Sequence, residues 1–214
     1  MSQTEQSIAQ APEPAEDSAK VRQILDGARK VFLKLGFDGA SMGDIARTAG
    51  VSKGTLYVYF ENKAELFSAL IAEERKHAKR DFHLDPDSPE IATDLRRYGE
   101  NLLGYISSAR NIRSVRTVIA IAEKFPKVGS DFYRDGPDRG IAHLARYLAA
   151  QAEAGRLRID DCEMAARQLQ VLMHTGVIYE MLYGVRTEPD AAEVARVADE
   201  AVKTFLARYG APSA

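Results

Sequence analysis

The 214-residue chain contains a single cysteine, Cys162, and no tryptophan. One cysteine excludes a disulfide within the chain and favours a reducing compartment, so we expect a cytoplasmic protein. The N-terminus has no apolar core of signal-peptide length. The most apolar later stretch, residues 171–185, is short and carries His174 and Glu180, which is unlike a membrane span.

Clusters of metal ligands and catalytic groups are also missing from the sequence. The four histidines lie in separate segments, at His77, His83, His143 and His174. Residues 160–163 (DDCE) have the composition of a helix N-terminus, where acidic side chains are favoured without any metal. The sequence has no glycine-rich phosphate loop, nucleophile elbow or pair of carboxylates on one helix face. We therefore expect no metal, no cofactor and no enzymatic activity.

Charge is distributed unevenly, although the net charge is only −2. Residues 1–17 are rich in Gln, Ala, Pro and Glu and have almost no large apolar side chains, so we expect a disordered acidic tail. Residues 20–80 carry twelve Lys and Arg against seven Asp and Glu, a charge of +5, and residues 81–214 carry seventeen against twenty, a charge of −3. A basic segment of this kind is suited to neutralising DNA phosphates, although chance clustering of surface charge is the alternative.

The stretch from Ser41 to Phe67 predicts two short helices across a tight turn, followed by the start of a third. Ser41, Ser52 and Asn62 each occupy a position where a helix N-cap is expected. Gly50 is expected to end the first helix, because glycine adopts the left-handed conformation without strain. Three closely spaced caps predict a rigid and compact unit.

The second of these helices is expected to have a polar outer face. Leu56 and Phe60 lie four residues apart and point inward, which leaves the remaining side chains outside. An exposed glycine within a helix costs about 1 kcal/mol relative to alanine, so Gly54 does not serve local stability. The lysine, threonine, tyrosine and capping serine of this stretch can reach phosphates or base edges, which is typical of a recognition helix in a DNA major groove. The alternative is an ordinary surface helix.

These residues closely resemble the DNA-binding signature of the tetracycline-repressor (TetR) family. The resemblance is carried by Ile45-Ala46, by residues 49–60 (AGVSKGTLYVYF) and by Lys63-x-x-Leu66-Phe67. Residues 125–176 are more loosely similar to the C-terminal domain of AefR-like members of the family. The resemblance implies a homodimer that binds a palindromic DNA operator and is released from it, as a repressor, by a small-molecule effector. A DNA-binding protein without an effector and a small helical enzyme are the alternatives.

The remaining helical periods predict an all-α fold of about nine helices. We expect a helix-turn-helix domain over residues 18–66 and a ligand-binding and dimerisation domain over residues 67–210. Ser88 and Pro89 should open a helix after the break at residues 85–89. Gly136-Pro137 should interrupt the helix that opens at Pro126, and residues 161–184 should form one continuous helix.

Eight residues are candidates for DNA contact. The family resemblance implies that Tyr59 and Lys63 meet phosphates, whereas Gly54, Thr55 and Tyr57 are better placed for bases. The full set is Ser41, Ser52, Lys53, Gly54, Thr55, Tyr57, Tyr59 and Lys63.

Polar and aromatic side chains on otherwise buried helical faces are candidates for effector contact, and they favour an apolar or aromatic ligand. These candidates are Tyr98, Tyr105, Arg116, Tyr133, His143, His174 and Tyr179, together with the apolar Leu102. Satisfied core groups are the alternative for each of them. The family resemblance also implies a two-fold four-helix interface made by the last two helices. Its candidate residues are Ala166, Met173, Val177, Val194, Ala198, Ala201 and Phe205.

Overall fold

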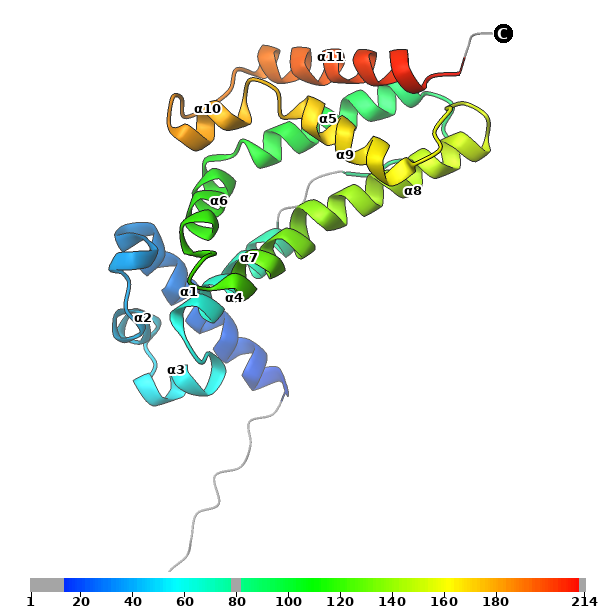
Figure 1. The fold of residues 1–214 in the computed structure, drawn as a ribbon. Coiled ribbons are helices and arrows are strands. Elements are labelled where there is room, and N and C mark those ends of the chain that lie inside the picture. The colour runs from blue at the N-terminus through cyan, green and yellow to red at the C-terminus, as the bar shows by residue number, and fades with distance from the viewer. Residues whose placement is uncertain (1–13, 78–81, 212–214) are drawn as a thin grey trace, which may run out of the picture. The chain divides into compact units, whose positions relative to one another are not determined.

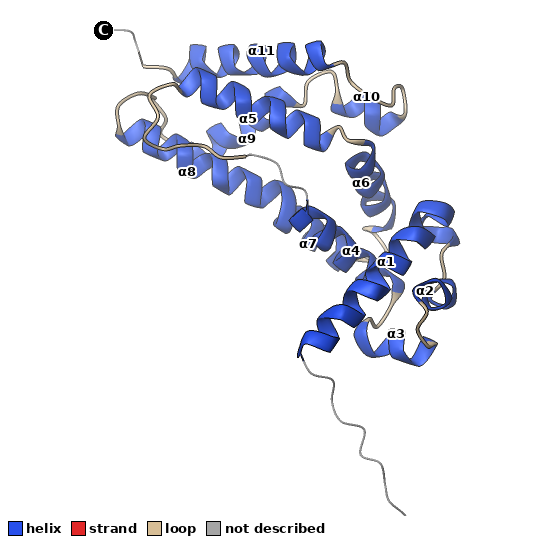
Figure 2. Cartoon of the chain, turned by 180° about the vertical axis from the view of Figure 1, so that it is seen from behind, coloured by secondary structure: helices blue, strands red, loops and turns tan. Residues whose placement is uncertain are grey.

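The computed structural model describes residues 14–77 and 82–211, and these form helices and connecting loops without a β-strand (Figures 1 and 2). The all-α fold class expected from the sequence is confirmed. The chain divides into two compact units, Met1–Glu74 and Arg75–Ala214. This division lies within α4, whereas the boundary expected from the sequence lies at residue 66. Most of the expected acidic tail lies outside the described residues. Within the described residues, no helix combines the length and apolar composition needed to cross a bilayer.

Unit 1 contains α1 (Pro14–Gly39), α2 (Met42–Ala49), α3 (Lys53–Tyr59) and most of α4 (Lys63–His77). α1 starts four residues before the expected Ser18, and Gly36 breaks its helical geometry with φ 70° and ψ 178°. Three aromatic rings, Phe32, Phe37 and Phe67, pack with centroids 5.3–5.9 Å apart. All three are buried and belong to the core of this unit.

A close approach between α1 and α2 fixes the position of the short α2 helix. A Cβ atom added to Gly27 would lie 2.6 Å from the Cβ of Ala49, so only glycine fits at this crossing. Gln23 of α1 also donates from Nε2 to the backbone oxygen of Ala49 at 2.7 Å. α1 therefore supports the pair of helices that follows it.

Unit 2 is a bundle in which α11 packs along α5 and α9, and α8 packs along α9 (Figure 1). Its elements are α5 (Ile91–Ile106), α6 (Ala109–Ile121), α7 (Pro126–Tyr133), the π-helical turn η1 (Arg134–Asp138), α8 (Arg139–Glu153), α9 (Cys162–Met173), α10 (Ile178–Tyr183) and α11 (Ala191–Tyr209). α5 begins at Ile91 without a side-chain cap, two residues after the expected Pro89, and Ser88 instead accepts from the Glu90 amide at 3.2 Å.

Gly136-Pro137 interrupts the α-helix, as expected, because α7 ends at Tyr133 and α8 begins only at Arg139. The interruption takes the form of the π-helical turn η1, so the chain stays helical across it. Pro137 has no amide hydrogen for the carbonyl five residues earlier, and this carbonyl, of Phe132, accepts from Arg75 Nη1 at 3.0 Å. The Arg75 guanidinium also lies 4.1 Å from the centroid of the Phe132 ring. A Cβ atom at Gly136 would come within 2.6 Å of this guanidinium, so glycine lets the guanidinium lie here without being displaced.

The expectation of one helix over residues 161–184 is wrong, because α9 ends at Met173 and α10 begins at Ile178. Gly176 between them has a φ of +75°, which glycine adopts without strain. Arg186 Nη2 donates to the Gly176 oxygen at 2.8 Å and so stabilises the break. The interrupted helix that opens at Pro126 counts as α7 and α8, and the helix expected over residues 161–184 is replaced by α9 and α10. The count therefore rises from about nine to eleven α-helices among the described residues.

Candidate nucleic-acid interface

Side-chain caps define both helices of the helix-turn-helix. Ser41 Oγ accepts from the Asp44 amide at 3.1 Å, and Ser52 Oγ accepts from the Thr55 amide at 2.9 Å. Gly50 ends α2 with a φ of +67°, and its amide bonds back to α2 carbonyls. The turn between the helices is therefore short, as the sequence predicts, and it is hydrogen-bonded at the end of α2 and at the start of α3.

The outer face of α3 is exposed because only one of its side chains is fully buried. Leu56 is buried completely, and Phe60 at the C-cap is 6% exposed. Ser52, Lys53 and Gly54 are exposed, Thr55 is half-buried, and Tyr57 is 47% exposed. Ser41 at the start of α2 is exposed too. Six of the eight candidate residues thus have surface available for a duplex.

The other two candidates, Tyr59 and Lys63, are held by unit 1 itself. Lys63 Nζ donates to the backbone oxygens of Phe37, Asp38 at 3.3 Å and Ala40 at 2.9 Å, and it lies 4.4 Å from the Phe37 ring centroid. An ammonium group has three hydrogens, and three carbonyls accept them here. These bonds give Lys63 a structural role at the end of α1, and the expected phosphate contact, which stays a prediction, would have to replace at least one of them.

Tyr59 is also fixed by a polar contact within the unit. Its hydroxyl donates to Asp17 Oδ1 at 2.7 Å, and its side chain is half-buried. A phosphate contact from this hydroxyl would have to replace the bond to a carboxylate. The expected phosphate contact of Tyr59 therefore stays a prediction that requires this bond to break, whereas Lys53 is exposed.

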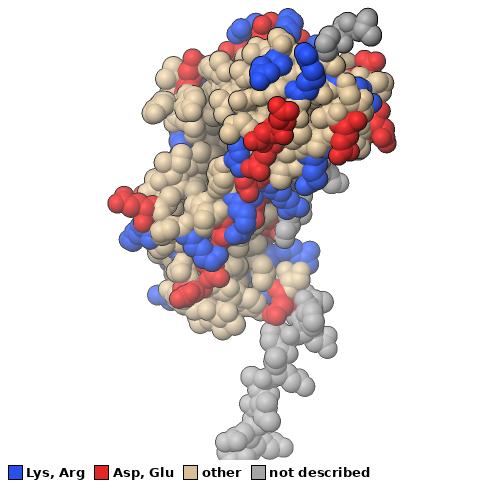
Figure 3. All heavy atoms as spheres, turned by 45° about the vertical axis from the view of Figure 1, so that its right-hand side comes forward, with Lys and Arg blue, Asp and Glu red and all other residues tan. Residues whose placement is uncertain are grey.

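Charges around the two helices are partly neutralised by their neighbours. The Ser41 hydroxyl, with Arg47 as the next contributor, lowers the pKa of the Asp44 carboxyl below its ordinary value. Arg47 pairs with Asp44, although its side chain is 77% exposed. On the molecular face in Figure 3, basic and acidic side chains are interspersed rather than separated into fields of one sign.

Val58 of α3 is missing from the candidates selected by sequence, although it is 80% exposed. The candidates other than Gly54 have side chains that can bind phosphates or base edges by hydrogen bonds or charge, and the valine side chain can do neither. The position of Val58 could have indicated that it is exposed. The residue one helical turn earlier is Gly54, so Val58 has no apolar neighbour there to pack against.

Three of the candidate effector residues gather around Phe82 in unit 2. The rings of Tyr98 and Tyr105 each lie 6.1 Å from the Phe82 ring. His143 Nε2 lies 2.9 Å from the Phe82 backbone oxygen. Gln170, which sequence reasoning missed, is 8% exposed and donates from Nε2 to the Tyr98 hydroxyl at 3.4 Å. Burial raises the pKa of Tyr98 above its ordinary value.

The remaining effector candidates lie elsewhere or serve other contacts. Arg116 donates to the carbonyls of Leu182, at 2.8 Å, and Met181, so it caps the end of α10. Tyr133 is half exposed and its hydroxyl accepts from Arg167, whereas Tyr179 is 67% exposed. Leu102 packs against the core of unit 2, and burial lowers the pKa of His174 below its ordinary value.

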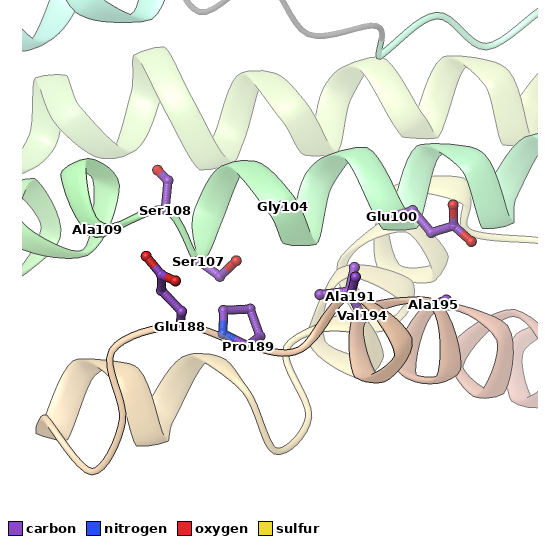
Figure 4. Close-up of a pocket in the computed structure, with 10 residues that line it drawn as sticks. All are labelled: Glu100, Gly104, Ser107, Ser108, Ala109, Glu188, Pro189, Ala191, Val194 and Ala195. Atoms are coloured by element: carbon purple, nitrogen blue, oxygen red, sulfur yellow. The ribbon is translucent and has the colours of Figure 1, made fainter.

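A separate open cavity of about 560 Å³ lies between the α5–α6 junction and the start of α11 (Figure 4). Its lining includes Glu100, Ser107, Glu188 and Val194, together with small residues of α11. None of the effector candidates is among its lining residues. Within the described residues, no group of three or more His, Cys, Asp or Glu side chains could hold a metal ion.

Most of the candidate dimer residues are buried inside unit 2, which corrects the expectation for these positions. Six of the seven are at most 4% exposed, namely Ala166, Met173, Val177, Ala198, Ala201 and Phe205. Side chains that the subunit's own core covers have no surface left for a second chain. Val194 is half-buried and lines the cavity.

Two family profiles match the chain. Residues 24–70 match the profile described as bacterial regulatory proteins of the tetR family, and residues 93–211 match the C-terminal domain of AefR-like transcriptional repressors. The chain is 40% identical over 165 residues to the HTH-type transcriptional repressor Rv1474c of Mycobacterium tuberculosis, covering 70% of this chain and 76% of that protein. It is 26% identical over 193 residues to the regulator SrpR of Pseudomonas putida, covering 88% and 86%.

Solved structures with the same fold cover nearly the whole chain. A TetR-family regulator from Mesorhizobium loti superposes with a TM-score of 0.81 at 27% identity, covering 90% of this chain and 98% of the other. The flavonoid-responsive regulator FrrA superposes with a TM-score of 0.78 at 29% identity, covering 92% and 100%.

Proposed function

Because the chain belongs to the TetR family of bacterial transcriptional regulators, we propose that it is a homodimeric repressor that leaves a palindromic operator when an aromatic effector binds. The chain is a DNA-binding regulator rather than an enzyme, as its relatives are. The exposed face of α3 is the observation that carries the proposal. A regulator that binds DNA acts where the DNA is, so we also propose that the protein is cytoplasmic.

The proposed DNA contacts are of two kinds: contacts to phosphates, which position the protein, and contacts to base edges, which recognise the sequence. Lys53 is exposed at the first position of α3 and neutralises a phosphate. Tyr57 and Thr55 lie further along the same short helix and bind base edges or the adjacent backbone. Ser41 and Ser52 combine their capping bonds with exposure at the two helix N-termini, where backbone amides also favour phosphate.

The homodimer is proposed to form through outer faces of α9 and α10 with α11 beside them. Met164 and Val171 lie seven residues apart on α9 and are 50% and 67% exposed. Tyr179 and Tyr183 lie four residues apart on α10 and are 67% and 83% exposed. Exposed apolar side chains gathered on neighbouring elements mark an association surface. Two copies of α3 would then meet successive major grooves, about 34–36 Å apart or a multiple of that spacing.

The cluster around Phe82 supports an aromatic effector that carries hydroxyl groups. The Tyr98–Gln170 hydrogen bond, at 3.4 Å, is long, so both groups can rebond to a ligand. Tyr98 and Tyr105 supply rings on which an aromatic ligand could pack. FrrA is named as flavonoid-responsive, and flavonoids are aromatic compounds with hydroxyl groups.

A gel-shift experiment with an operator selected from random duplex tests the proposal. Wild type should bind the operator and be released by a flavonoid, whereas Tyr57→Ala should stay folded and bind weakly at matched salt. Calorimetry should then give a weaker flavonoid affinity with operator present than without it, because coupling between two sites is reciprocal. Retained binding by Tyr57→Ala would contradict the proposed interface. Equal flavonoid affinities in both conditions would contradict the effector assignment alone.

A further inference from the structure

Val58 is an apolar side chain on a surface that is otherwise polar. It is 80% exposed, whereas Leu56, the other aliphatic residue of α3, is fully buried. Valine is also a poorer helix former than alanine, leucine or lysine, because its branched side chain loses rotamer freedom in a helix. Neither core packing nor helix stability therefore explains a valine at this position.

Gly54 lies one helical turn before Val58 and on the same face of α3. A Cβ atom added to Gly54 would meet no atom closer than Ser52 Oγ, at 3.7 Å, which is an ordinary van der Waals distance. Alanine would therefore fit within the subunit, and it would favour the helix more than glycine does. The reason for glycine must lie in what approaches this face from outside.

The DNA major groove offers one apolar group at its base edges, the 5-methyl of thymine. A side chain as short as valine reaches this methyl only if the helix backbone lies close to the bases. Glycine one turn earlier removes the Cβ atom that would hold the backbone away. Ser52 and Lys53 are exposed on the same short helix, and the neighbouring Tyr57, 47% exposed, combines an aromatic ring with a hydroxyl group. Val58 is therefore the one exposed aliphatic side chain of α3 on a small, mixed surface rather than part of a large apolar patch for another protein.

We propose that Gly54 and Val58 form a close-approach facet that reads a thymine methyl group in each operator half-site. This inference rests on the proposed function, because it requires α3 to enter the major groove. It makes Val58 a specificity-determining residue, whereas Lys53 contributes affinity without sequence preference.

Uracil substitution tests the inference, because uracil differs from thymine in duplex DNA only by the missing methyl group. An operator is first selected from random duplex with wild-type protein, and each thymine is then replaced by uracil in turn. One position in each half-site should weaken wild-type binding about fourfold, the value expected for one buried methyl group. Val58→Ala should bind the unmodified operator more weakly and should lose its sensitivity to uracil at that position only.

Further outcomes distinguish failure of the thymine-methyl inference from failure of the proposed DNA-binding function. Gly54→Ala should melt at a higher temperature than wild type and yet bind the operator more weakly, whereas tighter or equal binding would contradict the close approach. An operator that tolerates uracil at every position, or a Val58→Ala protein with the wild-type pattern of uracil sensitivity, would overturn the inference and leave the proposed function intact. Failure to select any operator would overturn both.

Discussion

Lys63 and Lys53 illustrate how two lysines ten residues apart differ in role. Replacing Lys63 with methionine should cost about 1–3 kcal/mol of unfolding free energy, because the carbonyls of Phe37, Asp38 and Ala40 lose their shared donor. Lys53→Met should change stability by less than about 0.5 kcal/mol, because Lys53 is exposed. Urea unfolding of both variants measures these effects.

The salt dependence of operator binding shows which of the two lysines, Lys53 or Lys63, contacts a DNA phosphate. Loss of one phosphate contact should reduce the slope of log affinity against log salt by about 1 per subunit, and we expect this only for Lys53→Met. A reduced slope with unchanged stability for Lys63→Met would contradict the structural role assigned to Lys63.

His174 makes the stability of unit 2 dependent on pH. Burial lowers its pKa below the ordinary value of 6.5, so the unfolded chain binds more protons than the folded one in mildly acidic solution. The stability that neutral His174 contributes is complete above pH 6.5 and is lost as the pH falls through 6.5 toward the lower folded pKa. Urea unfolding at pH 7.5 and 5.5 should therefore give a smaller loss for His174→Gln than for wild type. Equal losses would contradict burial of the neutral ring.

At the scale of elements, the crossing of α1 and α2 depends on Gly27. Gly27→Ala should destabilise the protein by about 1–3 kcal/mol, because the new Cβ would lie 2.6–2.8 Å from atoms of Ala49. Gly43→Ala is a matched control, since its new Cβ would meet only Ser41 Oγ at 3.7 Å. Amide exchange in α2 should accelerate in the first variant and not in the second. Unchanged exchange in Gly27→Ala would show that the crossing can relax at little cost.

Elements whose ends are set by nearby residues are the ones that the sequence predicts best. Ser41, Gly50 and Ser52 act within three or four residues of themselves, so the caps of α2 and α3 follow from the sequence. η1 does not follow, because it depends on Arg75, which is more than fifty residues away along the chain. The C-terminal end of α10 likewise depends on a distant partner, since Arg116 of α6 caps its carbonyls. The sequence therefore predicts the interruption at Gly136-Pro137 without its π-helical form, and it does not predict the break between α9 and α10.

The DNA-contact residues were likewise predictable only where their environment is set by residues nearby in the sequence. The exposure of Lys53, Gly54 and Tyr57 follows from the inward position of Leu56, which the sequence reveals. The tertiary bonds of Tyr59 and Lys63 join residues that are at least 23 positions apart, so they remained hidden. Helical periodicity also identified apolar faces of α9 and α11 without revealing that a single subunit buries them.

At the scale of the whole molecule, the exposed faces of α9 and α10 should determine whether two chains associate. Val171→Glu should convert the dimer to monomers, because it places a charge in the proposed apolar interface. Ile119→Glu is a matched control, since Ile119 of α6 is 66% exposed and Val171 is 67% exposed. Sedimentation equilibrium measures both. Dissociation by Ile119→Glu, with Val171→Glu still dimeric, would place the interface on a different surface.

The proposed function requires the outer face of α3 to bind duplex DNA in two copies. Selection from random duplex with the full-length wild-type chain, followed by sequencing, tests this requirement. We predict an enriched palindrome whose half-sites are one helical turn or a multiple apart, and much weaker enrichment when the selection is repeated with Tyr57→Ala. Equal enrichment of the same sequence by Tyr57→Ala, or no enriched sequence with wild type, would contradict this role of α3.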